Sequence, residues 1–248
     1  MLQSRLHHGR SMTFPYTVAS ILPSYLATLL DILWDIGAVK INAEEGHLTA
    51  FHERYPDAPR SPLYVNLRMR QNPKSGPLTT DEVGRIALAL NHLRQDVKVG
   101  ADWICGIPNA GTPLGRALSR MSEVLYLDIE KTEVDGQRRM FFGSPARPQD
   151  GDVVLIVDDV LSEATVKNLV LTLIKKTGAT PVLLVFLDRG QGGRARLVGQ
   201  GHAVHSVLTL ETFLGYYLRT SRLSVTAHDA CLAYPEQLAV FKAKRGIV

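Results

Sequence analysis

The chain has 248 residues, of which 45% are hydrophobic and 21% charged, so it can bury the core of one large α/β domain and is neither fibrous nor disordered in composition. The net charge of +4 is spread along the chain, a balance that suits an anionic small ligand at least as well as nucleic acid. No apolar run approaches the roughly 20 residues that cross a bilayer, and two distant cysteines favour a reduced cytoplasmic protein without a disulfide framework.

Residues 1–22 form a basic N-terminal extension without aspartate or glutamate. A transit peptide has this bias, and so does an ordinary frayed terminus, which we favour. Pro23 to Ile36 carries leucines at helical spacing and stops before a glycine, which predicts an amphipathic helix. Residues 38–66 hold turn formers and short β-like pieces such as Leu63 to Asn66, as in an irregular flap. We therefore group residues 23–79 as an N-terminal helix and hood.

Residues 80–210 alternate between helix and strand patterns. Thr80 begins a helix that runs to about Leu93, with acids in its first turn, where the helix dipole favours negative charge. The other expected elements are strands at 103–106, 124–129, 152–157, 181–187 and 203–208 and helices at 112–121 and 166–177. This order predicts an α/β fold: a mostly parallel, twisted sheet with helices on both faces.

Two segments lie outside this alternation. Residues 130–151 are polar and contain glycine and proline, and a stretch of this length is either a mobile lid or a β-hairpin excursion. Residues 211–248 form a C-terminal region that is expected to be helical.

The most informative segment is the apolar strand 152–157 with the polar residues that follow it. Asp158 and Asp159 fall at the carboxyl end of this strand, where open α/β sheets bind ligands. The hydroxyls of Ser162 and Thr165, together with the free amides of a helix start, are suited to a phosphate. The segment thus favours a phosphoribose site. Solvated loop acids, helix-capping acids, and a receiver-type or haloacid-type aspartate cluster are alternatives that the local pattern leaves open.

Five segments in order carry a resemblance to a known family. They are residues 37–40, residues 61–66, residues 106–114, the strand that ends in Asp158-Asp159, and residues 187–193. In this order the chain resembles the type I phosphoribosyltransferases, and among them the orotate phosphoribosyltransferases, over roughly residues 32 to 200.

The resemblance implies a role for each segment. Asp158 and Asp159 would hold the ribose hydroxyls of phosphoribosyl pyrophosphate and oppose the charge that develops at C1′. The 5′-phosphate cradle would be Ser162, Glu163, Ala164 and Thr165, and the pyrophosphate loop would be Pro108, Asn109, Ala110 and Gly111. Lys131 would act over the pyrophosphate, and the residues of the base subsite would be Lys40, Tyr64 and Arg189. The resemblance also implies Mg²⁺ that arrives with the substrate, and a homodimer.

Purely structural interpretations of these residues are alternatives to the functional roles. Lys40 can be a surface lysine beyond a helix, and Arg189 can pair structurally with Asp188 or another acid. The glycines at 192 and 193 can be turn residues only.

The chain departs from the family pattern at its phosphate-handling positions. Glu163 adds a like charge beside a dianion, and Ala164 stands where the family usually has glycine. Ala110 replaces the usual lysine of the pyrophosphate loop, and the mobile-loop cations reduce to Lys131, with Arg138 and Arg139 as candidates further along. Because leaving-group stabilisation depends on positioned positive charge, these departures predict weak or altered activity.

Two functions of different classes follow from these observations. The first is an enzyme, a pentosyltransferase that moves 5-phosphoribose to a base such as orotate. The second is a non-catalytic protein that senses a nucleotide or a phosphoribosyl compound on the same fold. A weaker third interpretation, a nucleic-acid-binding surface, would require salt-sensitive binding of oligonucleotides.

Overall fold

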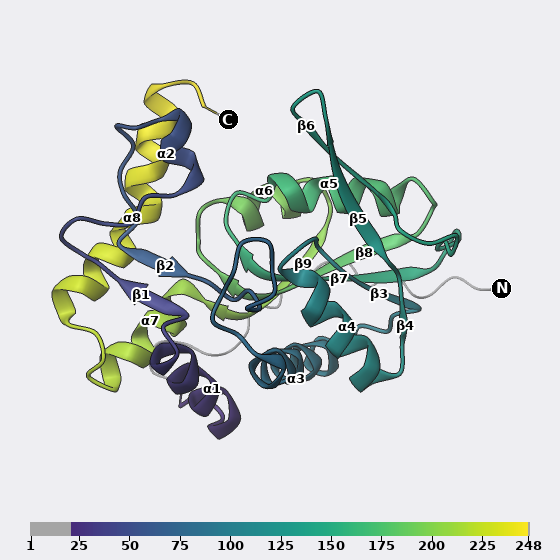
Figure 1. The fold of residues 1–248 in the computed structure, drawn as a ribbon, viewed down its shortest axis with the longest axis horizontal. Coiled ribbons are helices and arrows are strands. Elements are labelled where there is room, and N and C mark those ends of the chain that lie inside the picture. Colours follow the sequence, from purple (N-terminus) through teal and green to yellow (C-terminus); the bar gives the residue numbers. More distant parts are fainter. Residues whose placement is uncertain (1–20, 248) are drawn as a thin grey trace.

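The computed structural model describes residues 21–247, in which five strands form one parallel sheet. Its spatial order is β4 (Leu125–Tyr126), β3 (Trp103–Gly106), β7 (Val153–Leu161), β8 (Thr180–Asp188) and β9 (Ala203–Thr209). Each pair of neighbours is parallel, as alternating strands and helices predict. The fold class expected from the sequence is therefore confirmed (Figure 1).

Helices cover both faces of this sheet, which explains the unbroken apolar runs in its central strands. In β7, Leu155 and Val157 join the core cluster of one face, whereas Val154 and Ile156 join that of the other. The first cluster is completed by α1 (Ser24–Asp35), α3 (Thr80–Asp96), α4 (Gly111–Ser122) and α7 (Leu210–Arg219). The second is completed by α5 (Thr165–Lys175) and α6 (Gly193–Gly199).

The predicted hood is a two-stranded antiparallel sheet with a short helix. It consists of β1 (Val39–Ile41), β2 (Leu63–Val65) and α2 (Ala50–Arg54). The C-terminal helix α8 (Val225–Lys244) lies beside α2 (Figure 1), and the rings of Phe241 and Phe51 meet at 6.3 Å between centroids. The hood is thus packed between the sheet and the C-terminal region.

The polar stretch after β4 forms a β-hairpin rather than a structureless lid. Its strands are β5 (Ile129–Val134) and β6 (Gln137–Phe142), and the hairpin projects well beyond the sheet (Figure 1). Asp135 and Gly136 both have positive φ, of 52° and 71°, as a two-residue hairpin turn requires. Of the two alternatives left open by the sequence, the structure has the hairpin.

Three expectations about the elements need correction. The strand expected at 124–129 is only Leu125–Tyr126, because the chain leaves the sheet and begins the hairpin at Ile129. Leu127 and Ile129 are nevertheless buried, so apolarity alone did not reveal the break. The short helices α2 and α6 were not predicted, because each is too brief to show helical periodicity.

The cysteines, the helix lengths and the chain regions complete the description. Cys105 and Cys231 are free and buried. In residues 21–247 no helix combines the length and apolarity needed to cross a membrane. The interpretation of the basic N-terminal extension concerns residues that, up to residue 20, lie outside the described part of the chain, and the boundaries of the four predicted regions stay predictions.

Candidate functional site

A cavity of about 1060 Å³ opens at the carboxyl ends of β3 and β7. The chain continues from β3 toward β4 on one side and from β7 toward β8 on the other, so the strand order reverses here. Open α/β sheets bind ligands at such a reversal, because the loops that follow the two strands separate and leave a crevice. Residues from both loops line the cavity, together with residues from the hood and the hairpin.

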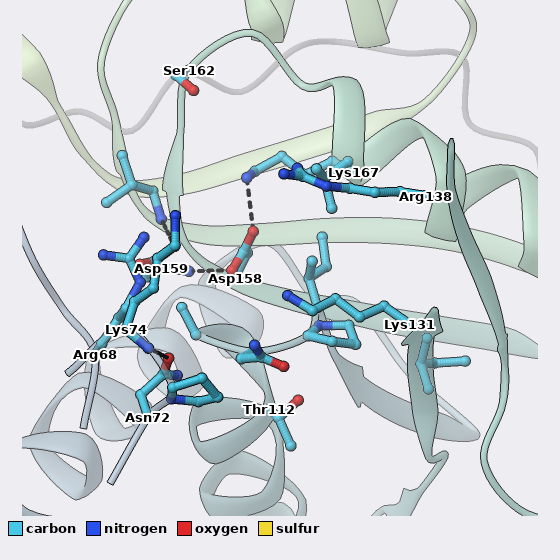
Figure 2. A pocket seen from close by; sticks show the side chains of 18 of the residues that line it. Arg68, Asn72, Lys74, Thr112, Lys131, Arg138, Asp158, Asp159, Ser162 and Lys167 are labelled. Carbon is cyan, nitrogen blue, oxygen red and sulfur yellow. Dashed lines mark hydrogen bonds and ion pairs between the residues drawn. The ribbon is translucent and has the colours of Figure 1, made fainter. Parts of the chain in front are cut away.

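The two predicted aspartates lie in the floor of this cavity (Figure 2). Asp158 Oδ1 accepts a hydrogen bond from the backbone N–H of Asp159 at 2.9 Å, and Asp159 Oδ1 accepts one from Val160 at 2.7 Å. Burial, reinforced by the neighbouring charge of Asp158, raises the pKa of Asp159 to about 7. An increasing fraction of Asp159 is therefore protonated as the pH falls below neutral.

The sequence interpretation missed Lys167, which enters the cavity from the first turns of α5. Its Nζ lies 2.7 Å from Asp158 Oδ2, and its side chain is only 11% exposed (Figure 2). Helical spacing in the sequence could have revealed it, since residues 167, 170, 171 and 174 form the buried face of α5. A lysine within such an apolar stripe is uncommon unless it is paired, and it marks a candidate functional residue.

The predicted phosphate turn is only partly aimed at the cavity. Ser162 lines it, whereas Glu163, Ala164 and Thr165 do not. The Glu163 carboxylate instead forms an ion pair with Lys242 of α8, so the like charge expected from the sequence is directed away from the cavity. Ala164 adopts the left-handed conformation, with φ of 68°, immediately before α5 begins.

The predicted pyrophosphate loop lies across the cavity from this turn. Pro108, Asn109 and Ala110 line the cavity, and Gly111 begins α4. A Cβ at Gly111 would lie 2.4 Å from the carbonyl oxygen of Val157, so only glycine lets this loop pack against β7. The loop is thus held beside the aspartates without a cation of its own.

Positive charge reaches the cavity from the hairpin and from the loop before α3. Lys131 and Arg138 line it, and both lie on the hairpin face opposite to Arg139, which does not. Burial and the nearby charges of Arg138, Lys74 and Arg68 lower the pKa of Lys131. Lys74 and Arg68 come from a loop to which the sequence interpretation gave no role.

The predicted base subsite retains two of its three residues. Tyr64 and Arg189 line the cavity, but Lys40 does not, and its side chain is exposed on β1. The Arg189 guanidinium donates to Ser61 Oγ at 2.8 Å and to the Leu63 carbonyl oxygen at 3.1 Å.

Arg189 has no carboxylate partner within residues 21–247. Asp188 lies 3.9 Å from Arg194 instead, so a structural pair between Asp188 and Arg189 is excluded. The Nε of Arg189 is buried without a hydrogen-bond partner, and burial lowers its pKa. An unpaired guanidinium at the wall of a cavity is suited to an anionic or oxygen-rich ligand.

The residues of the cavity do not fit a metal ion held by the protein. Within the described chain, no group of three or more His, Cys, Asp or Glu side chains is arranged to hold one. Asp158 is already paired with Lys167, and Asp159 has a raised pKa. Mg²⁺ in proteins is usually held by one or two carboxylates together with substrate phosphates. Of the four acids that line this cavity, Asp158 is paired with Lys167 and Asp128 with Arg116, so the protein by itself offers a poor site for such an ion.

The chain was compared with protein-family models, with curated proteins and with solved structures. No protein-family model matches the chain. It is 29% identical over 157 residues to the uridine 5′-monophosphate synthase of Bos taurus, which covers 62% of this chain and 31% of that protein. It is 36% identical over 74 residues to a xanthine phosphoribosyltransferase of Pseudomonas syringae, which covers 29% of this chain and 39% of that protein. The matches thus span well under half the length of either relative.

Solved structures show the same fold over most of the chain. The UMP synthase of Leishmania donovani has a TM-score of 0.62 at 20% identity and covers 85% of this chain and 42% of its own. The orotate phosphoribosyltransferases of Aeropyrum pernix and Francisella tularensis have TM-scores of 0.60 and 0.61 at 19% and 15% identity. They cover 79% and 88% of this chain and 99% and 98% of their own. The resemblance drawn from the motif order is therefore confirmed: the chain has the type I phosphoribosyltransferase fold of the orotate enzymes.

Proposed function

We propose that this protein is a phosphoribosyltransferase that moves the 5-phosphoribosyl group of phosphoribosyl pyrophosphate to a ring nitrogen of an acidic base such as orotate. The observation that carries the proposal is that one cavity contains the aspartate pair, Ser162, the loop 108–110 and the unpaired Arg189. These groups match the sugar, the phosphate, the leaving group and the base in turn. The similarity to UMP synthase and to orotate phosphoribosyltransferases supports the same choice of substrate.

At the sugar, Asp158 and Asp159 would accept hydrogen bonds from the ribose hydroxyls. Transfer breaks the bond between C1′ and the pyrophosphate oxygen and forms a bond between C1′ and the base nitrogen, so positive charge develops on the ribose between the two events. Carboxylates held below the ring oppose that charge at no cost in reorganisation. The leaving pyrophosphate takes the electron pair of the broken bond, and the base nitrogen gives up its proton to the pyrophosphate or to solvent as the new bond forms. Lys131 and Arg138 of the hairpin are placed to stabilise the pyrophosphate charge.

At the base, Arg189 would bind the ligand's carboxylate or paired ring oxygens. Its contacts with Ser61 and Leu63 orient the guanidinium at the cavity wall. A guanidinium without a carboxylate partner favours a ligand that carries a carboxylate or ring oxygens over one with an apolar edge. Lys40 has no part in this proposal.

The direct test is turnover of the full chain with phosphoribosyl pyrophosphate, Mg²⁺ and orotate, and with xanthine as a second base. Formation of a nucleotide and pyrophosphate in equal amounts is expected. The control is the double variant Asp158→Asn/Asp159→Asn, which keeps the shape of both side chains and removes their charge. Rates no higher than this control with both bases would reject both substrates.

A second candidate function is a non-catalytic sensor of the same ligands. Two observations favour it: Ala110 brings no cation to the pyrophosphate loop, and Asp158 is already paired with Lys167. A sensor would bind phosphoribosyl pyrophosphate or a nucleotide in calorimetry and show no turnover. It is rejected if nucleotide forms, or if neither ligand produces heat or shifts the melting temperature.

We also propose a homodimer, as the sequence resemblance implies. Light scattering of the purified full chain tests it, since a dimer would have twice the 27.3 kDa mass of one chain. A concentration-independent monomer would overturn this part.

A further inference from the structure

Among the described residues, Lys167 is the cation of the cavity wall that forms an ion pair with Asp158. It stands on α5, which follows β7, so the same strand and helix carry both members of the pair. Figure 2 shows its side chain crossing the cavity toward Asp158, with Ser162 on the one side and Lys131 on the other. Its ammonium group therefore lies where the sugar and its phosphates would bind.

A lysine in this position is unusual on energetic grounds. It shares the buried face of α5 with Val170, Leu171 and Ile174, which belong to the apolar core, whereas Lys167 lines the cavity. Burial of a charge is costly unless a partner offsets it, and Asp158 is that partner. Two apolar residues in place of Lys167 and Asp158 would stabilise the fold as well as the ion pair does. Stability therefore does not explain the lysine, and binding of a ligand is the other role that its position allows.

The rest of the cavity lacks what a divalent cation would need. Of the four acids in the cavity wall, Asp158 is paired with Lys167 and Asp128 with Arg116, and no cluster of three metal-ligating side chains occurs in residues 21–247. A ligand with one phosphate and one pyrophosphate still requires compensation of several negative charges. Lys167, Lys131 and Arg138 are arranged around the space where those charges would lie.

We propose that Lys167 is a ligand-binding residue that supplies, from the protein itself, the positive charge otherwise brought by a divalent metal, so that phosphoribosyl pyrophosphate binds without one. The proposal rests on the proposed function for the identity of the ligand. It differs from the magnesium-borne substrate that the sequence resemblance implies. Lys167 also keeps Asp158 in place for the ribose hydroxyls.

The experiment is calorimetric titration of the full chain with phosphoribosyl pyrophosphate, once in excess EDTA and once in millimolar Mg²⁺. The wild-type Kd is expected to differ by less than about threefold between the two buffers. Lys167→Met keeps the length of the chain and removes its charge. It is expected to weaken binding at least tenfold in EDTA, and Mg²⁺ is expected to recover part of that loss. Lys167→Arg, which keeps the charge, should remain close to the wild type in EDTA.

Lys176→Met is the matched control, since Lys176 is exposed at the far end of the same helix and should bind as the wild type does. Wild-type binding that requires Mg²⁺ by more than tenfold overturns this inference and leaves the proposed function standing. So does unchanged binding by a folded Lys167→Met variant in EDTA. The absence of phosphoribosyl pyrophosphate binding in both buffers rejects the proposed function, and the inference with it. If the thermal melt shows that Lys167→Met does not fold, the inference is tested by two other measurements: the ratio of the wild-type Kd values in EDTA and Mg²⁺, and the Kd of Lys167→Arg in EDTA.

Discussion

Among single residues, Asp159 has the most pH-sensitive environment in the cavity. Its folded-state pKa of about 7 lies above the ordinary value of 3.8, because burial and Asp158 disfavour its charged form. Between these two values the folded chain binds more protons at this site than the unfolded chain, so the contribution of Asp159 to stability falls as pH rises.

We therefore expect the unfolding free energy of the wild type, relative to Asp159→Asn, to decrease from about pH 4 to pH 7 and to level off above that. Asparagine does not titrate, so the difference isolates this one carboxyl. Urea unfolding of both proteins at pH 4.5, 6.0 and 7.5 measures it. A difference that is flat or that grows with pH would contradict the proposed environment of Asp159.

Sequence reasoning located cavity residues at the carboxyl ends of strands. Asp158 lies near the end of β7, and Ser162 and Arg189 directly follow β7 and β8. They were found because the ends of parallel strands meet at one edge of a sheet.

Residues that reach the cavity from other elements were predicted less well. Lys131 of the hairpin and Tyr64 of the hood were named only through the family resemblance. Lys167 was missed because helical periodicity draws attention to apolar positions, and the lysine among them was not considered. Lys40, which the resemblance assigned to the base subsite, does not line the cavity, and its side chain is exposed on β1.

At the level of elements, the alternation of side chains along a strand determines which cations of the hairpin face the cavity. Arg138 and Arg139 are neighbours on β6, but successive side chains of a strand point to opposite faces, and only Arg138 lines the cavity. The sequence named both as candidates, and the pairing of β5 with β6 separates them.

Arg138→Ala is expected to weaken binding of phosphoribosyl pyrophosphate about tenfold, which corresponds to about 1.4 kcal/mol. Arg139→Ala, which removes the same charge from the other face, is expected to change it by less than twofold. Calorimetry of the two variants under one salt condition makes the comparison. Equal losses in both would mean that the hairpin acts through general charge and not through contact.

The phosphate turn is held by Gly193 of α6, a residue of the fifth family segment for which the sequence left open a role as a turn residue only. The N–H of Gly193 donates to the carbonyl oxygen of Ser162 at 2.9 Å, and a Cβ at Gly193 would lie 2.1 Å from that oxygen. The close approach therefore excludes any side chain, and it positions the turn.

Gly193→Ala is expected to lower the unfolding free energy by about 1–3 kcal/mol and to weaken binding of ribose 5-phosphate, because the turn must move. Gly199→Ala is the control, since it lies in the same helix with nothing within 4 Å of the added Cβ. It should stay within about 0.5 kcal/mol of the wild type. Similar losses for both variants would show that the cost comes from α6 alone.

Over the whole molecule, α8 connects the hood to the phosphate turn. Lys242 pairs with Glu163 of the turn and lies 5.3 Å from the centre of the Phe51 ring in α2. The sequence predicted a helical C-terminal region and a mostly parallel sheet with helices on both faces, because both follow from local patterns of helix and strand. It could not predict this contact, since nothing local relates residue 242 to residue 163.

Lys242→Met should leave the Glu163 carboxylate free to repel a phosphate, and should weaken ribose 5-phosphate binding several-fold. The part-exposed pair itself is expected to contribute about 1 kcal/mol or less to stability. Adding Glu163→Gln should restore the affinity, which a double-mutant cycle detects. Lys244→Met, on the exposed end of α8, is the control. A double variant as weak as Lys242→Met would show that the lysine acts without Glu163.

The uneven charge of the cavity wall has a kinetic consequence. Seven lysines and arginines line it against four aspartates and glutamates, and a concave wall with an excess of positive charge produces a positive potential at its mouth. A polyanion would then be steered during diffusion, so its association rate should fall steeply as salt rises, whereas its dissociation rate should change little. The positions of these cations thus determine the association rate of an anionic ligand as well as its affinity.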